Sequence, residues 1–161
     1  MFNIGDKVVY PMHGAGIIES VEEVVLDGCC QKYYVMLIPM GNLRIKIAAS
    51  KASNAGLRCV HDKDKLLECI RTAQCPCKDR GAPGSNWNQR YKDNLERIRS
   101  GKMEELAVVF RSLLQREQER GLSSVEKKML QNVRQIILSE LILSQNIEHA
   151  EAENLLANVV N

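Results

Sequence analysis

A single tryptophan precedes a group of basic residues in the middle of the chain, and this combination could bind DNA. Trp87 is followed by Arg90, Lys92, Arg97, Arg99 and Lys102. Arginine and lysine bind phosphates, and an aromatic ring can stack on a base or wedge between base steps. The free amides at a helix start would favour the same anionic partner. Alternatively, Trp87 packs the helix onto its neighbours, since tryptophan is usually well buried.

The charge of the chain is unevenly distributed. The 161 residues carry a formal net charge of +2. Residues 61–102 hold ten Lys or Arg against six Asp or Glu, whereas residues 103–161 hold six against nine. The middle third is therefore where an anionic partner would bind. So small an excess predicts modest, salt-sensitive DNA affinity, and tight binding would need a second anchor.

Cysteines near this basic segment raise the alternative of a metal or redox site. Cys69, Cys75 and Cys77 lie close together in sequence, with His61 upstream. Structural zinc usually uses cysteine pairs separated by two to four residues, whereas Cys75 and Cys77 are separated only by Pro76. The spacing favours no metal and no cofactor.

Catalytic motifs are missing from the sequence. His13, His61 and His149 are not accompanied by a glycine-rich phosphate loop, a nucleophile elbow or a paired metal motif. We therefore expect a protein that is not an enzyme. The sequence also lacks a run of about 18 apolar residues and a secretory signal, so we expect a cytoplasmic protein without a membrane partner. Nothing requires a dimer, and we expect a monomer.

The elements that would position these residues divide the chain into two modules. Residues 1–60 contain five β-rich segments separated by turn signals, which predicts a small barrel. The predicted strands are Val8 to Tyr10, Ile17 to Val25, Lys32 to Ile38, Leu43 to Ile47 and Leu57 to Val60. Asp27-Gly28 and Gly41-Asn42 predict tight turns that join the middle strands into a meander. In the fourth strand, alternation places Arg44 and Lys46 opposite the core face.

Residues 61–161 read as an all-α module, so the fold class is α+β. The predicted helices are Lys63 to Thr72, about Asn86 to Arg99, a stripe from Leu106 to Leu114 that ends before Gly121, a long helix after Ser123, and a last helix capped by Asn146. Capping boxes are indicated for Asn86 with Gln89 and for Ser123 with Glu126. The Pro- and Gly-containing segment before Asn86 predicts a loop.

Three sequence blocks resemble the CarD family of bacterial transcription regulators. They are FNIGDKVVYPMHG from Phe2, NWNQRYKDNL from Asn86, and ERGLS from Glu119 with EKKML from Glu126. The first block is also similar to the polymerase-interacting domain of transcription-repair coupling factors. The other two blocks are typical of the full-length CarD-type regulator.

The resemblance implies an SH3- or Tudor-like β domain that docks on the RNA polymerase β subunit by extending a sheet. It also implies a helical domain that reaches promoter DNA near the −10 element. There Trp87 would enter the minor groove at the upstream edge of the bubble and stabilise the open complex. The DNA-facing positions of the family fall on Gln89, Arg90, Lys92 and Lys127. Gln89 stands where relatives can carry another arginine.

On the polymerase side, the resemblance points to Lys46, with Arg44 beside it on the same strand. A second basic position of the family falls on Val24, which weakens the expected electrostatic part of this contact. Main-chain pairing between strand edges would not need that side chain. The alternative is a protein-only adaptor that links polymerase or a repair factor to another protein without touching DNA.

Overall fold

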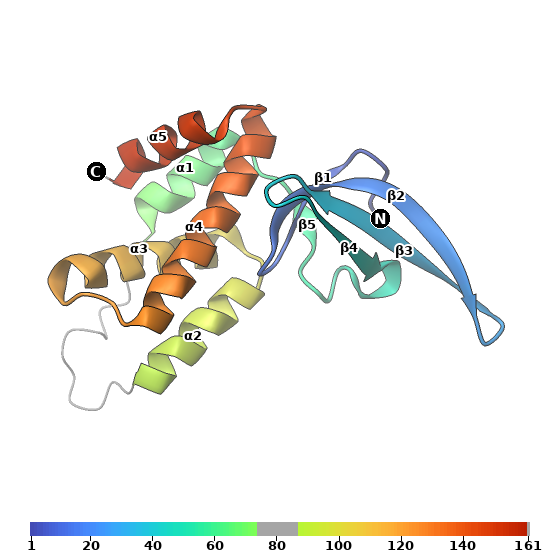
Figure 1. Ribbon diagram of the computed structural model, residues 1–161, viewed down its shortest axis with the longest axis horizontal. Helices are drawn as coiled ribbons and strands as arrows, with labels where there is room; N and C mark the ends of the chain where they lie inside the picture. Colours follow the sequence, from blue (N-terminus) through green and yellow to red (C-terminus); the bar gives the residue numbers. More distant parts are fainter. Residues whose placement is uncertain (74–86, 161) are drawn as a thin grey trace.

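A β sheet followed by a group of helices forms the molecule, as the computed structural model of residues 1–73 and 87–160 shows (Figure 1). The predicted α+β class is confirmed. The sheet is antiparallel and has five strands in the order β4-β3-β2-β1-β5. The strands are β1 (Lys7–Tyr10), β2 (Gly14–Leu26), β3 (Cys29–Ile38), β4 (Leu43–Ala48) and β5 (Arg58–Cys59).

The predicted closed barrel is not confirmed, because β4 and β5 are the two edges of the sheet and do not pair within the described ranges. Only two residues of β5 pair with β1, through Val8 with Cys59 and Val9 with Arg58. The short 3-10 helix η1 (Ala49–Lys51) and the turns after it carry the chain from one edge to the other. Closure of a barrel depends on pairing between strands that are far apart in sequence. The local residue patterns that predict individual strands do not show which distant strands pair.

The β2–β3 hairpin extends well beyond the rest of the sheet (Figure 1). Its turn residues Asp27 and Gly28 have φ of 50° and 78°. Two successive positive φ values match the right-handed twist of the strands, which is why Asp-Gly suits this turn. Together with β4, these strands form the predicted meander.

Within the described ranges, five helices follow the sheet: α1 (Lys63–Thr72), α2 (Trp87–Arg99), α3 (Met103–Glu119), α4 (Ser124–Gln145) and α5 (His149–Val160). The capping box of Ser123 and Glu126 at the start of α4 is confirmed. The prediction for Asn146 is wrong, since this residue ends α4 in the left-handed conformation, with φ of 53°, and does not begin α5. Asparagine tolerates that conformation, so it suits a helix end as well as a start. Asn86 lies outside the described residues.

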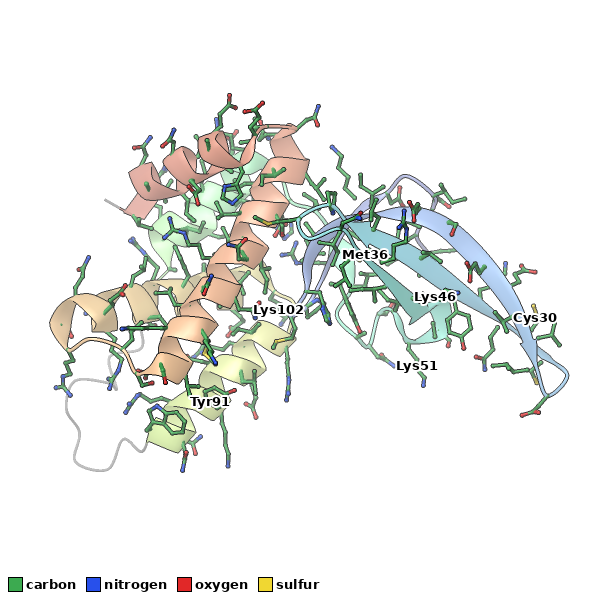
Figure 2. All side chains as sticks on the ribbon, in the orientation of Figure 1. Cys30, Met36, Lys46, Lys51, Tyr91 and Lys102 are labelled. Carbon is green, nitrogen blue, oxygen red and sulfur yellow. The ribbon has the colours of Figure 1, made fainter. Side chains whose placement is uncertain are left out.

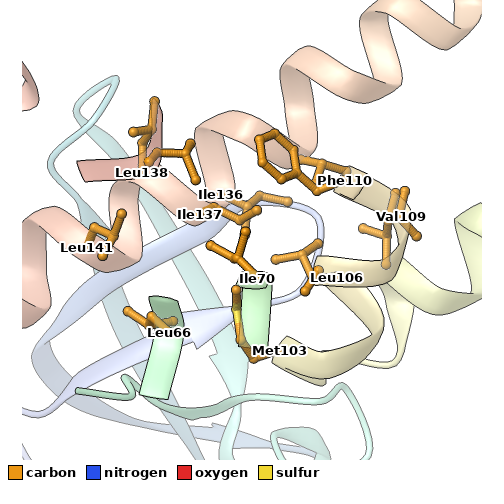
Figure 3. Packing of buried hydrophobic residues seen from close by; sticks show 14 of the residues in the cluster. Leu66, Ile70, Met103, Leu106, Val109, Phe110, Ile136, Ile137, Leu138 and Leu141 are labelled. Carbon is orange, nitrogen blue, oxygen red and sulfur yellow. The ribbon is translucent and has the colours of Figure 1, made fainter. Parts of the chain in front are cut away.

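The helices share one large apolar core with part of the sheet (Figure 3). Phe110 of α3 and Ile137 of α4 are both at most 1% exposed within it. Val9 of β1 and Ala15 of β2 belong to this same cluster. A second cluster lies on the β side and includes Val8, Ile18 and Met36. The sheet therefore takes part in both clusters.

Helix α4 is the element that joins the two parts. The Ala15 amide donates to Ser139 Oγ over 2.9 Å, and Lys7 Nζ donates to the Leu143 carbonyl over 2.7 Å. A Cβ on Gly14, whose φ is 113°, would lie 2.8 Å from Ser139 Oγ. Glycine is thus required where β2 approaches α4. None of the helices in the described ranges has the length and apolar character to cross a membrane.

Candidate functional site

Trp87 lies on the surface at the start of α2. Its side chain is 39% exposed, and its ring stacks on Tyr91 with 5.7 Å between ring centroids and 14° between planes. Tyr91 packs against the large core. The two residues are four apart, so a helix places them on one face. The sequence left open whether Trp87 packs in the core or is exposed at the surface. The structure favours the exposed ring, which stacks on Tyr91.

The other predicted DNA-binding positions lie on α2 and at the start of α4. Gln89 and Lys92 are both exposed. The Gln89 side-chain amide donates to Asp93 Oδ1 over 2.9 Å, one helical turn further on. Lys127 is exposed at the start of α4. These positions could meet a phosphate backbone beside a base-contacting ring, and their role in DNA binding stays a prediction.

Arg90 points toward the neighbouring helices. Its side chain is 16% exposed, and Nη2 lies 3.8 Å from Glu126 Oε1. Arg116 Nε of α3 lies 3.3 Å from the same carboxylate oxygen. The other oxygen of Glu126 accepts from the Ser123 amide over 3.0 Å. Glu126 thus connects α2, α3 and α4 at Arg90, three residues after Trp87.

The contrast between Arg90 and Lys92 gives a matched pair of variants on one helix. We expect Arg90→Gln to lower the free energy of unfolding by about 1–3 kcal/mol, because Glu126 loses a partly buried cation. Lys92→Gln should leave stability unchanged and reduce the slope of log affinity for DNA against log salt by about 1. Urea denaturation and DNA titration at several salt concentrations measure the two effects. A loss of DNA affinity in stably folded Arg90→Gln would instead make this arginine a phosphate contact.

The positions predicted to face polymerase share the outer face of the sheet. Lys46 pairs with Val35 and Arg44 with Leu37 in the β3–β4 register, and Val24 of β2 lies on the same face. Both cations are ion-paired across β3. Arg44 Nε lies 2.9 Å from Glu19 Oε2, and Lys46 Nζ lies 2.6 Å from Glu22 Oε2. The hydrogen bond from Arg44 holds the pKa of Glu19 below its ordinary value.

This outer face is well separated from α2, as the positions of Lys46 and Tyr91 in Figure 2 show. The molecule thus carries two distinct candidate surfaces. One is a sheet face with paired charges next to an unpaired strand edge, since β4 is an edge strand. The other is the start of α2, where the Trp87 ring and basic side chains lie.

The metal alternative lacks a site in the part of the chain that the structure describes. There, no group of three or more metal-ligating side chains comes together. Burial raises the pKa of the Cys69 thiol, which disfavours the thiolate that binds metals. Cys75 and Cys77 lie outside the described residues.

Comparison with known proteins covers both parts of the chain. Residues 2–60 match the family described as "CarD-like/TRCF RID domain", and residues 77–157 match "CarD, C-terminal domain". The protein belongs to the CarD family. A relative in Bacillus subtilis (strain 168), named "Putative transcription factor YdeB", is 38% identical over 154 residues, which are 96% of this chain and 99% of the relative.

Sequence reasoning missed four partners of the predicted CarD-family residues. Tyr91 could have been found, because it stands four residues after Trp87 on a predicted helix. Glu19 and Glu22 could not, since their pairing with Arg44 and Lys46 depends on the β2–β3–β4 register. Glu126 was recognised as a capping residue, but its place beside Arg90 and Arg116 requires the packing of α2 and α3.

Proposed function

We propose that this CarD-family protein is a non-enzymatic transcription regulator that binds the RNA polymerase β subunit and stabilises the open promoter complex. In this proposal the outer face and edge of the sheet contact polymerase, while the start of α2 contacts promoter DNA near the −10 element. The observation that carries it is the exposed Trp87 ring at the start of α2, stacked on Tyr91, with Lys92 exposed on the same helix and Lys127 exposed at the start of α4. Family membership supports the same function.

Two contacts on one molecule explain how modest DNA affinity can suffice. When one contact docks on polymerase, the other meets DNA at high effective concentration, which can raise overall affinity 10²–10⁴-fold. A ligand that binds melted DNA better than duplex DNA shifts the equilibrium by its differential affinity. A preference of about 1.4 kcal/mol raises the ratio of open to closed complex tenfold.

Promoter-opening kinetics test the proposal. Polymerase and a promoter carrying a fluorescent base analogue near −10 are mixed with and without the protein, and the open-complex lifetime is measured after a competitor is added. We expect the protein to lengthen the lifetime. An unchanged lifetime, together with polymerase binding but no salt-dependent binding to a forked promoter duplex, would support the protein-only adaptor instead.

Charge reversal at Lys46 tests the polymerase surface, and the ion pair with Glu22 supplies its control. Lys46→Glu should weaken polymerase binding about threefold to fivefold, in the range of an exposed charge contact. This variant also places two carboxylates side by side. The double variant Lys46→Glu/Glu22→Lys keeps the ion pair but moves the cation to β2. Equally weak binding by both variants, measured by titration with labelled polymerase, is the expected result. Full recovery in the double variant would remove Lys46 from the contact.

A further inference from the structure

A buried ion pair connects the end of the sheet to α4. Arg58 of β5 donates from Nη1 to Glu140 Oε1 over 2.6 Å and from Nη2 to Glu140 Oε2 over 2.8 Å. Its Nε donates to the Gly101 carbonyl, between α2 and α3. The Glu140 side chain is fully buried and also accepts from the His61 amide over 2.9 Å. One guanidinium therefore contacts the sheet, α4 and the α2–α3 connection together.

The neighbouring contacts lie on the same face of α4. Ser139 and Leu143, which bind Ala15 and Lys7, are one residue before and three residues after Glu140. Residues three and four apart share a helix face, so these contacts form one strip along the second half of α4. The first half of the same helix carries Glu126, which contacts Arg90 three residues from Trp87. Thus α4 connects the sheet at one end to the Trp87 region at the other.

Helix α4 is long between these two contacts, so a small change in its orientation on the sheet produces a large displacement near Trp87. Glu126 and Glu140 are fourteen residues apart on one helix, which corresponds to about 21 Å at 1.5 Å per residue. A tilt of about 10° at Glu140 would displace the far end by about 3.7 Å. That displacement exceeds the rise of about 3.4 Å per nucleotide along one DNA strand. A small change at the sheet would move the tryptophan to a different base step.

We propose that the Arg58–Glu140 pair is a positioning device, which fixes α4 on the sheet so that Trp87 meets a defined base step when the sheet is docked on polymerase. The link to promoter DNA rests on the proposed function. Buried ion pairs add little net stability compared with apolar residues of similar size. A bidentate arginine–carboxylate pair does, however, restrict both distance and direction. The main contribution of the Arg58–Glu140 pair is therefore to fix the orientation of α4 on the sheet.

The decisive variant removes both charges. Arg58→Met/Glu140→Leu leaves no unpaired buried charge, so the chain should still fold. The His61 amide and the Gly101 carbonyl lose their partners, which should lower the free energy of unfolding by about 1–3 kcal/mol for each group. Its matched control is Arg97→Met/Glu105→Leu, which removes an ion pair between α2 and α3, with 2.7 Å between Arg97 Nη1 and Glu105 Oε2. That pair does not touch the sheet. If the first variant fails to fold, Glu140→Gln keeps the side-chain shape and an oxygen acceptor while weakening the pair.

Distances between spin labels measure orientation without any polymerase. Labels are attached at Lys51→Cys on η1 and Lys128→Cys on α4 of the full chain, with the native cysteines replaced by serine. Both lysines are exposed. We expect one narrow distance distribution in the parent chain and in the control variant. A broadened or shifted distribution is expected in Arg58→Met/Glu140→Leu. An unchanged distribution there overturns the proposal.

Polymerase assays then test the consequence for promoters. The Arg58→Met/Glu140→Leu variant should bind polymerase with unchanged affinity but lose most of the gain in open-complex lifetime. A broadened distance distribution with a fully retained lifetime would overturn the positioning role. If the parent protein itself gives no gain in lifetime, the proposed function fails. The spin-label distances still decide whether the ion pair fixes α4 on the sheet.

Discussion

Replacing Trp87 with alanine should shorten the open-complex lifetime that the protein confers, by about fivefold to 150-fold if the ring contributes the 1–3 kcal/mol of a stacked base. Polymerase affinity should stay the same, because Trp87 lies on α2 and the proposed polymerase surface, which includes Lys46, lies on the sheet (Figure 2). Stability should change little, since the ring is 39% exposed. The measurement is open-complex decay at saturating protein.

Two further variants make this result specific. Val125→Ala removes an apolar side chain of equal exposed fraction, 39%, from the nearby start of α4, and it should leave the lifetime unchanged. Trp87→Phe keeps an aromatic ring and should give an intermediate lifetime. A Trp87→Ala protein that stabilises the open complex as well as the parent does would exclude the wedge.

Phe110→Ala should have the largest effect on folding, lowering the free energy of unfolding by about 3–5 kcal/mol. The ring is 1% exposed and belongs to the core that also contains Val9 and Ala15 of the sheet. The loss of stability should therefore reduce amide-exchange protection in β1 as well as in the helices. Urea denaturation followed by circular dichroism gives the free energy, and amide exchange shows where protection is lost.

The control for this variant is Leu26→Ala in the β2–β3 hairpin, where the side chain is 51% exposed. It should change stability by less than about 0.5 kcal/mol. If Phe110→Ala reduced protection in the helices while β1 kept all of its protection, the sheet and the helices would not unfold as one unit.

Local signals in the sequence predicted much of this fold. Helix α1 begins and ends at the predicted residues, Lys63 and Thr72, and Asp62 caps it by accepting from the Lys65 amide. The Asp27-Gly28 turn and the Ser123–Glu126 capping box were likewise predicted from neighbouring residues. Each of these features is determined by side chains within a few positions of one another.

Features that depend on distant residues were not predicted. The sheet is open in the described residues, with β4 and the two-residue β5 at its edges. The position of Arg90 beside Glu126 follows from the packing of α2 on α4, and that of Arg58 beside Glu140 follows from the packing of the sheet on α4. Composition identified the basic middle segment. It did not show which of its cations face solvent, because that depends on ion pairs with carboxylates from other elements.

The contact between Ala15 and Ser139 also limits how this protein can be recombined. A chimera that joins residues 1–60 to an unrelated helical domain would leave the Ala15 amide without its acceptor and the Arg58 guanidinium without its carboxylate. Each buried donor left unsatisfied would cost about 1–3 kcal/mol. A β domain grafted from a relative would have to bring the matching face of α4 with it. The boundary after residue 60 that sequence comparison suggests is therefore not a position at which the two parts can be separated without loss of stability.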